Sequence, residues 1–163
     1  MLGTRFCSSL HLKKNENDDS LWIKIKKELT GEREDIFIGT VYLSPYKSNY
    51  ENLKNISDLF EEILAFKEKG EVIIQGDFNS RTNIDDGIIG PDKFDGSVII
   101  NDLNIPGRNS EDKVPSDHRG KELIELCKAL NLVILNGRKA GDLFGKCTSF
   151  QWNGASVVDY VLT

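Results

Sequence analysis

The stretch Glu71-Val72-Ile73-Ile74-Gln75-Gly76-Asp77-Phe78-Asn79 joins an apolar run to a polar turn. A short run rich in β-branched residues, bounded by turn residues, is typical of a strand buried on both faces. Asp77 and Asn79 follow this run, and side chains two positions apart in an extended segment point the same way. Because open α/β sheets bind ligands at the carboxyl ends of their strands, we expect a polar site here. An ordinary Gly-Asp-x-Asn turn is the alternative that spacing alone leaves open.

Two strands and a helix are predicted upstream of this stretch. Apolar and polar residues alternate over 21–29, and 36–43 is apolar on both faces, so these segments are expected to pair as a hairpin. Ser48 and Glu51 fit a capping box, and Gly70 fits a helix end. The apolar residues between these positions recur at helical spacing: Leu53, Ile56, Leu59, Phe60, Ile63 and Leu64. The order strand, helix, strand indicates α/β architecture.

Downstream, residues 80–118 form a long segment rich in Gly, Asn, Asp and Pro, which indicates a functional loop or disorder. Asp117 is expected to cap a helix that ends near Asn131, and a strand is predicted over 132–136. The apolar stripe of this helix consists of Leu123, Ile124, Cys127 and Leu130.

The last segments predict a strand pair, 147–152 and 156–162, around a turn at 153–155. The sequence stops inside an apolar strand, and a sheet edge without a neighbour invites pairing with another chain. We therefore expect an incomplete domain over 21–163, preceded by a polar segment over 1–20, and self-association through exposed sheet edges.

Composition limits the class of protein. The 163 residues are 39% hydrophobic and 29% charged, close to the averages of globular proteins. The formal net charge of −5 leaves no chain-wide basic field that would attract nucleic acid or an anionic membrane. No apolar run approaches the roughly 18 residues of a membrane span. We expect no signal peptide, and we therefore expect an intracellular location. Cys7, Cys127 and Cys147 are far apart, which indicates buried thiols rather than a disulfide framework or a zinc site.

Four segments follow one another in a characteristic order. Val41-Tyr42-Leu43-Ser44-Pro45 and Gly76-Asp77-Phe78-Asn79 precede Cys147-Thr148-Ser149-Phe150 and Ser156-Val157-Val158-Asp159-Tyr160-Val161-Leu162. Together they resemble the endonuclease/exonuclease/phosphatase superfamily, from about Leu21 to the last residue. The likeness is closest to the reverse transcriptase-associated endonuclease domains of non-LTR retrotransposons and to craniofacial-development-protein-2-like relatives. It runs through Ser80-Arg81-Thr82, Arg119-Gly120, Leu135-Asn136-Gly137-Arg138 and Gly141-Asp142.

The resemblance implies a DNase I-like four-layer α/β sandwich, a nuclear location by ancestry, and Mg²⁺- or Mn²⁺-dependent hydrolysis of phosphodiesters in DNA. Asp77 would activate or align the attacking water, and Asn79 would hold a phosphate oxygen or a metal water. Tyr42 would orient the scissile phosphate, Thr148 would contact the substrate, and Asp159 would hydrogen-bond a histidine. Asp77 and Asn79 are the candidate metal ligands, since Mg²⁺ prefers oxygen donors.

The sequence also departs from the family pattern at both ends. The family places an Asn and a metal-binding Glu on strands before the Tyr segment, and nothing before Leu21 resembles those strands. Its final Ser-Asp-His triplet should follow Asp159, whereas Ser116-Asp117-His118 precedes that residue and is expected to cap a helix. Removing a general acid or base costs about 10²- to 10⁴-fold in rate. We therefore expect a truncated family member, a fragment with weak or no activity.

Two other functions stay open. A catalytically inactive remnant would act as a binding or interaction module through its sheet edges. A phosphatase of inositol phosphates or a sphingolipid-type phosphodiesterase belongs to the same superfamily, but its additional substrate-loop motifs are not found. Residues 80–118 hold eight acidic and four basic side chains, whereas a loop that faces DNA is more often basic. The expectation of DNA as substrate therefore depends on the resemblance.

Overall fold

The computed structural model describes residues 11–14, 20–45, 55–85, 107–138 and 140–163. Two compact units emerge, the first formed by the chain up to Asn79 together with Asp159–Thr163, and the second by Ser80–Val158. The structure is mixed α/β, as the order of segments predicts. In the described part of the chain, no helix has both the length and the apolar character needed to cross a membrane.

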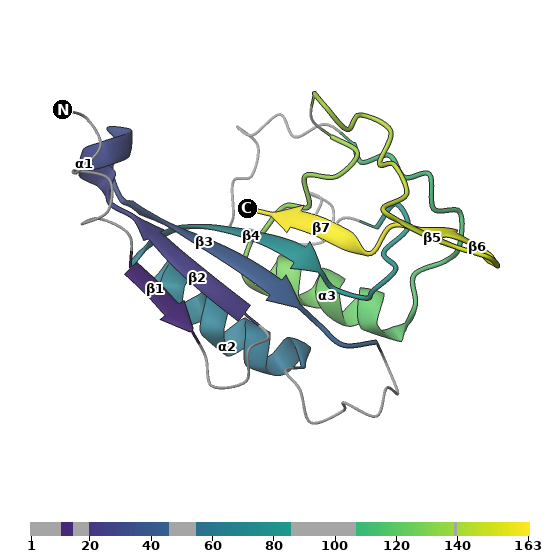
Figure 1. Cartoon of the computed structure of the whole chain (residues 1–163), viewed down its shortest axis with the longest axis horizontal. Coiled ribbons are helices and arrows are strands. Elements are labelled where there is room, and N and C mark those ends of the chain that lie inside the picture. The colour runs from purple at the N-terminus through teal and green to yellow at the C-terminus, as the bar shows by residue number, and fades with distance from the viewer. Residues whose placement is uncertain (1–10, 15–19, 46–54, 86–106, 139) are drawn as a thin grey trace, which may run out of the picture. The chain divides into compact units, whose positions relative to one another are not determined.

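The first unit contains a mixed five-stranded sheet (Figure 1). Its strands, in spatial order, are β1 (His11–Lys14), β2 (Ser20–Ile25), β3 (Asp35–Tyr42), β4 (Gly70–Asp77) and β7 (Asp159–Leu162). β3 and β4 are parallel and the other neighbours are antiparallel, so the predicted hairpin is confirmed. β1 lies within the range 1–20 that we expected to be a polar segment before the domain, so this part of that range adds a strand to the sheet.

The predicted strand over 21–29 is wrong beyond Ile25. Lys27–Thr30 form α1, a single helical turn that Gly31 ends in the left-handed conformation. The apolar alternation that favours a strand stops at Ile25, and all four side chains of the turn are exposed. Asp35 holds the turn in place by accepting a hydrogen bond from the Lys27 N–H at 2.9 Å.

The amphipathic helix predicted before Gly70 is confirmed as α2 (Ile56–Lys67). Asn55 caps it, and Asp58 completes a capping box by accepting from the Asn55 N–H at 3.2 Å. The capping box predicted at Ser48 and Glu51 lies outside the described residues.

One face of the sheet packs against α2, which lies behind the strands in Figure 1. Phe66 of the helix stacks on Trp22 with ring centroids 4.2 Å apart, and it contacts Phe37 at 5.1 Å. A Cβ at Gly39 would lie 2.8 Å from the Trp22 ring, so glycine at this position leaves the space that the indole fills. This aromatic cluster anchors α2 to the sheet.

The second unit contains α3 (His118–Ala129) and a hairpin of β5 (Ser149–Gln151) and β6 (Gly154–Ser156). Asp117 caps α3 as predicted, since its carboxylate accepts from the Gly120 N–H at 2.6 Å. Asn131 adopts the left-handed conformation that suits the expected helix end. Residues 80–85 and 107–117, the described parts of the long segment, contain no helix or strand.

The strand predicted over 132–136 is wrong. It contains a single bridged residue, Ile134, which is fully buried. The carbonyl of Ile134 accepts a hydrogen bond from Arg138 Nε at 2.9 Å, so a side chain of the same segment satisfies this acceptor.

The strand predicted over 156–162 is divided. β6 ends at Ser156 and β7 begins at Asp159 in the other unit. Between them, the Val157 N–H donates to the Asp112 carboxylate at 3.2 Å, which replaces a ladder hydrogen bond. The thiols also differ in part from expectation, because Cys127 is buried but Cys147 is only half-buried; Cys7 lies outside the described residues.

Candidate functional site

The carboxyl ends of β3 and β4 and the start of β7 bring three of the expected site residues side by side. Tyr42 is the register partner of Asp77, and Asp77 is the partner of Asp159. Register partners share a face of a sheet. Phe37, five positions before Tyr42 on β3, contacts Phe66 of α2, so the three site residues occupy the opposite face. The Tyr42 side chain is 48% exposed and both carboxylates are half-buried.

The neighbours of Asp77 fix its backbone. Gly76 has a φ of +145°, and a Cβ there would lie 1.9 Å from the Val41 carbonyl oxygen, so only glycine lets β4 lie this close to β3. Phe78 is fully buried and packs edge-on against Tyr160, with ring centroids 5.9 Å apart. The close approach of β4 to β3 at Gly76 therefore fixes the backbone before Asp77, and the packing of Phe78 on Tyr160 fixes it after Asp77.

Asn79 connects the turn to the end of β3. Its backbone has a φ of +44°, in the left-handed region that Asn tolerates better than most residues. Its N–H donates to Asp77 Oδ1 at 2.8 Å, and its Nδ2 donates to the Leu43 carbonyl at 2.8 Å. The Asn79 side chain also hydrogen-bonds the Asp77 carboxylate, so its amide oxygen is the part that can contact a ligand. The four residues Tyr42, Asp77, Asn79 and Asp159 are called the carboxylate edge below.

Burial raises the pKa of Asp77, and the negative charge of Asp159 raises it further. The hydrogen bond from the Asn79 N–H acts in the opposite direction. Two carboxylates on adjacent strands thus repel each other at neutral pH. A cation or a hydrogen-bond donor placed between them would relieve this repulsion.

The donors of the carboxylate edge are all oxygen atoms, which suits Mg²⁺ or Mn²⁺ better than Zn²⁺. Magnesium often binds proteins through one or two carboxylates and completes its coordination with water and substrate phosphate. Asp77, Asp159 and the amide oxygen of Asn79 fit that donor preference. No group of three or more His, Cys, Asp or Glu side chains able to hold a metal occurs among the described residues.

Thr148, the fifth expected site residue, belongs to the second unit and lies just before β5. It is exposed, and its Oγ1 accepts a hydrogen bond from the Val158 N–H at 3.1 Å. Its own N–H donates to the Ser156 carbonyl at 2.9 Å. These contacts give Thr148 a structural role at the base of the hairpin.

The triplet Ser116-Asp117-His118 serves the start of α3. Asp117 is the helix cap, and Ser116 Oγ donates to the Thr82 carbonyl at 2.9 Å. His118 is exposed on the first turn, 3.6 Å from Glu122 on the next turn. The predicted capping role is confirmed for Asp117.

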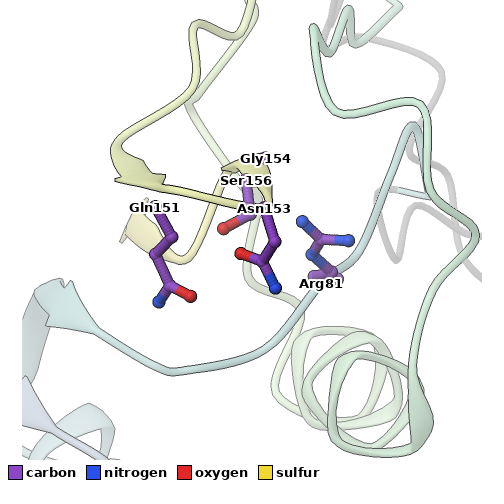
Figure 2. A pocket seen from close by; sticks show the side chains of 5 residues that line it. All are labelled: Arg81, Gln151, Asn153, Gly154 and Ser156. Atoms are coloured by element: carbon purple, nitrogen blue, oxygen red, sulfur yellow. The ribbon is translucent and has the colours of Figure 1, made fainter.

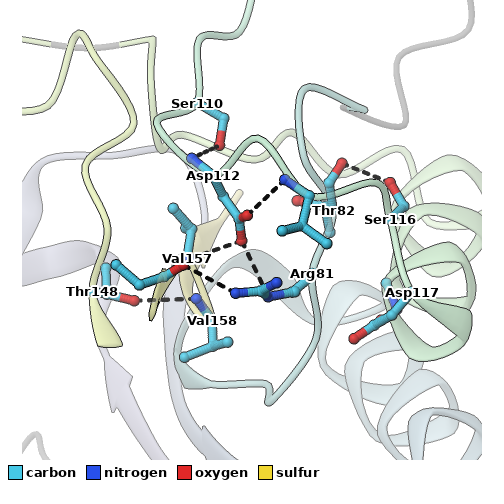
Figure 3. Close-up of polar contacts among 12 residues, drawn as sticks. Arg81, Thr82, Ser110, Asp112, Ser116, Asp117, Thr148, Val157 and Val158 are labelled. Atoms are coloured by element: carbon cyan, nitrogen blue, oxygen red, sulfur yellow. Dashed lines mark hydrogen bonds and ion pairs between the residues drawn. The ribbon is translucent and has the colours of Figure 1, made fainter. Parts of the chain in front are cut away.

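Asp112 is a buried residue that sequence reasoning missed, because it lies in a polar segment without periodicity. Its side chain is 1% exposed and lies 3.4 Å from Arg81 Nε (Figure 3). It accepts hydrogen bonds from the N–H groups of Val157 and Val114 at 3.2 and 3.1 Å. Arg81 also donates to the Ala155 carbonyl at 3.0 Å. Asp112 and Arg81 together fix the loops of the second unit.

A polar pocket of about 310 Å³ lies beside this ion pair, lined by Arg81, Gln151, Asn153, Gly154 and Ser156 (Figure 2). Its side chains offer hydrogen-bond donors and acceptors. Because buried Asp112 balances the charge of Arg81, the pocket carries no excess positive charge that would favour a phosphate.

Comparison of the chain with protein-family models and with curated proteins gives no match. The case for a function therefore depends on the resemblance of the motifs and on the geometry described above.

Proposed function

We propose that this chain is a metal-dependent phosphodiester hydrolase that acts on DNA, related to the endonuclease domains of non-LTR retrotransposons. The observation that supports this proposal is the row Tyr42, Asp77 and Asp159 across three adjacent strands, with Asn79 bonded to Asp77. We also propose that the sheet and α2 form one half of a DNase I-like four-layer sandwich.

Each residue of the carboxylate edge has a chemical task in this proposal. Asp77 accepts a proton from the attacking water, for which a pKa raised by burial suits a general base. Tyr42 presents an exposed hydroxyl that hydrogen-bonds a phosphate oxygen, and Asn79 positions the Asp77 carboxylate through its backbone N–H and its side chain. Asp159 adds the second carboxylate. When bound, Mg²⁺ or Mn²⁺ supplies positive charge that stabilises the developing charge on the phosphate.

The proposed activity is weak. The resemblance gives Asp159 a histidine partner from a Ser-Asp-His triplet, and Ser116-Asp117-His118 instead forms the start of α3. The segment 80–118 carries a net charge of −4, which opposes the approach of DNA. Residual hydrolysis would then depend on positioning by the carboxylate edge and on the metal.

A nicking assay on supercoiled plasmid tests this proposal. Wild type in Mg²⁺ should convert plasmid to the open circle, and Asp77→Asn should lower the rate by about 10²- to 10⁴-fold because the base is lost. Glu61→Gln, which removes an exposed carboxylate on α2, is the matched control and should nick at the wild-type rate. Equal nicking by wild type and Asp77→Asn, or persistence of nicking in chelator, would contradict the proposal.

A further inference from the structure

The tip of the β5–β6 hairpin holds a reactive pair of residues that the proposed function does not use. Gln151 is the register partner of Gly154, so Trp152 and Asn153 form a two-residue turn. Asn153 and Gly154 are both exposed, and a Cβ at Gly154 would meet nothing within 4 Å. No other described part of the chain therefore crowds Gly154.

An asparagine side chain that precedes glycine can be attacked by its own backbone. The peptide nitrogen of Gly154 loses its proton and bonds to the side-chain carbonyl carbon of Asn153, and ammonia leaves, which closes a succinimide ring. Water then opens either carbonyl of this ring and gives aspartate or its isomer isoaspartate. Glycine favours this reaction because it has no side chain to hinder the approach and its backbone is the least restricted.

The hairpin also lets this turn reach the geometry of attack. β5 and β6 form a two-stranded sheet of their own, with three residues in each strand. Short isolated hairpins are marginally stable, and loop tips open at small cost in free energy. Ring closure requires the nitrogen and the carbonyl carbon to approach to about 3 Å, which a turn that opens readily can reach.

A second Asn-Gly pair, Asn136-Gly137, is held differently. Gly137 is buried, and its N–H donates to Asp142 Oδ2 at 3.3 Å. Its carbonyl accepts from the Asn109 N–H at 3.1 Å, and the Asn136 carbonyl accepts from Arg108 Nε at 3.3 Å. The nitrogen that would attack is thus already hydrogen-bonded, and both backbone carbonyls are fixed. This pair must open locally before it can react.

We propose that Asn153 is a site of spontaneous deamidation through a succinimide closed by the Gly154 nitrogen, and that the fold protects Asn136 from the same reaction. The product places a carboxylate in the pocket that Arg81 lines (Figure 2). Because Asp112 already balances the charge of Arg81 and the other lining side chains are uncharged, the pocket becomes negative. This modification goes beyond the proposed hydrolysis and does not depend on it.

Incubation of the full chain in mildly alkaline buffer, followed by tandem mass spectrometry of its peptides, tests the proposal. Asn153 should be converted to aspartate and isoaspartate at least ~10-fold faster than Asn136, because the buried pair must first open. Asn131 is also exposed but precedes Leu132, so it is the control for exposure. It should react at least ~10-fold more slowly than Asn153, since a bulky neighbour hinders the attack. The rate at Asn153 should rise with pH, because the attacking nitrogen must lose its proton.

Unfolding the chain in guanidinium chloride separates the effect of the fold from that of the sequence. Asn136 and Asn153 should then react at similar rates, while Asn131 stays slow. In the folded chain, Asn153→Gln lengthens the side chain and should abolish the product at this position without changing the rates at the other two asparagines.

Three results would overturn the proposal. These are similar rates at Asn136 and Asn153 in the folded chain, conversion of Asn131 as fast as that of Asn153, and no conversion at Asn153 in the folded chain while the unfolded chain reacts there.

Discussion

At the scale of single residues, the carboxylate edge depends on a glycine. Gly76 lets the backbone of β4 approach the Val41 carbonyl, and this approach places Asp77 opposite Tyr42 and Asp159. A residue with a Cβ would clash with the Val41 carbonyl oxygen, and it would have to adopt a positive φ that is unfavourable for it.

Gly76→Ala should therefore lower the free energy of unfolding by about 3 kcal/mol or more, the sum of overpacking and of strain at positive φ. Urea denaturation followed by circular dichroism measures this change. Gly154→Ala is the matched control: its φ is also +145°, but a Cβ there meets nothing within 4 Å. A smaller loss is expected for the control, and equal losses would show that the contact with Val41 is unimportant.

Asp77 should make stability depend on pH. Its pKa in the folded chain is raised above the ordinary value of 3.8, chiefly by burial and further by Asp159. The folded state then holds a proton that the unfolded state has already lost, so stability falls as pH rises from about that ordinary value through the raised one. In metal-free buffer, Asp77→Asn should be more stable than wild type at pH 7, and the difference should vanish near pH 3. A difference that does not change with pH would contradict this account.

At the scale of elements, buried Asp112 and its partner Arg81, which is 27% exposed, join the loops of the second unit. Asp112 accepts two backbone N–H groups and contacts Arg81, and these contacts connect segments on either side of α3.

Asp112→Ala should lower the free energy of unfolding by about 3 to 5 kcal/mol, because it leaves Arg81 without its buried partner and two N–H groups without an acceptor. Thermal or urea denaturation measures the loss. Glu122→Ala, in an exposed pair with His118, should change stability by less than about 1 kcal/mol. Loss of comparable size in both variants would contradict the assigned role of Asp112.

Elements with strong periodicity were predictable. The strands around 36–43 and 71–75 and the helix after Asp117 have apolar patterns that match one period over many residues. β1 was not predictable, because four residues give too short a pattern. The segment 132–136 reads as a strand, but its acceptor at Ile134 is taken by Arg138, a contact that periodicity does not show.

The sequence predicts which residues belong to the candidate site better than it predicts how they are arranged. Asp77 and Asn79 follow from a polar pair after a buried strand, and Tyr42 and Asp159 follow from the resemblance. That β7 would pair with β4, and so set Asp159 opposite Asp77, depends on a break at Val157 and Val158. At this break the Val157 N–H donates to Asp112, which is distant in sequence.

At the scale of the whole molecule, the chain leaves the first unit after Asn79 and returns to it at Asp159. Adjacent ends of β3, β4 and β7 therefore bring together residues from three distant parts of the sequence. This convergence is the central claim on which the proposed hydrolysis depends.

The most direct test of that claim is hydrolysis of the small diester bis(4-nitrophenyl) phosphate in Mg²⁺ or Mn²⁺, since this substrate needs no contacts with a polymer. Wild type should release nitrophenolate above the rate of metal alone, and Asp77→Asn and Asp159→Asn should each lower that rate by about 10²-fold or more while Glu61→Gln does not. Release at the same rate by wild type and by both Asp variants would contradict the account.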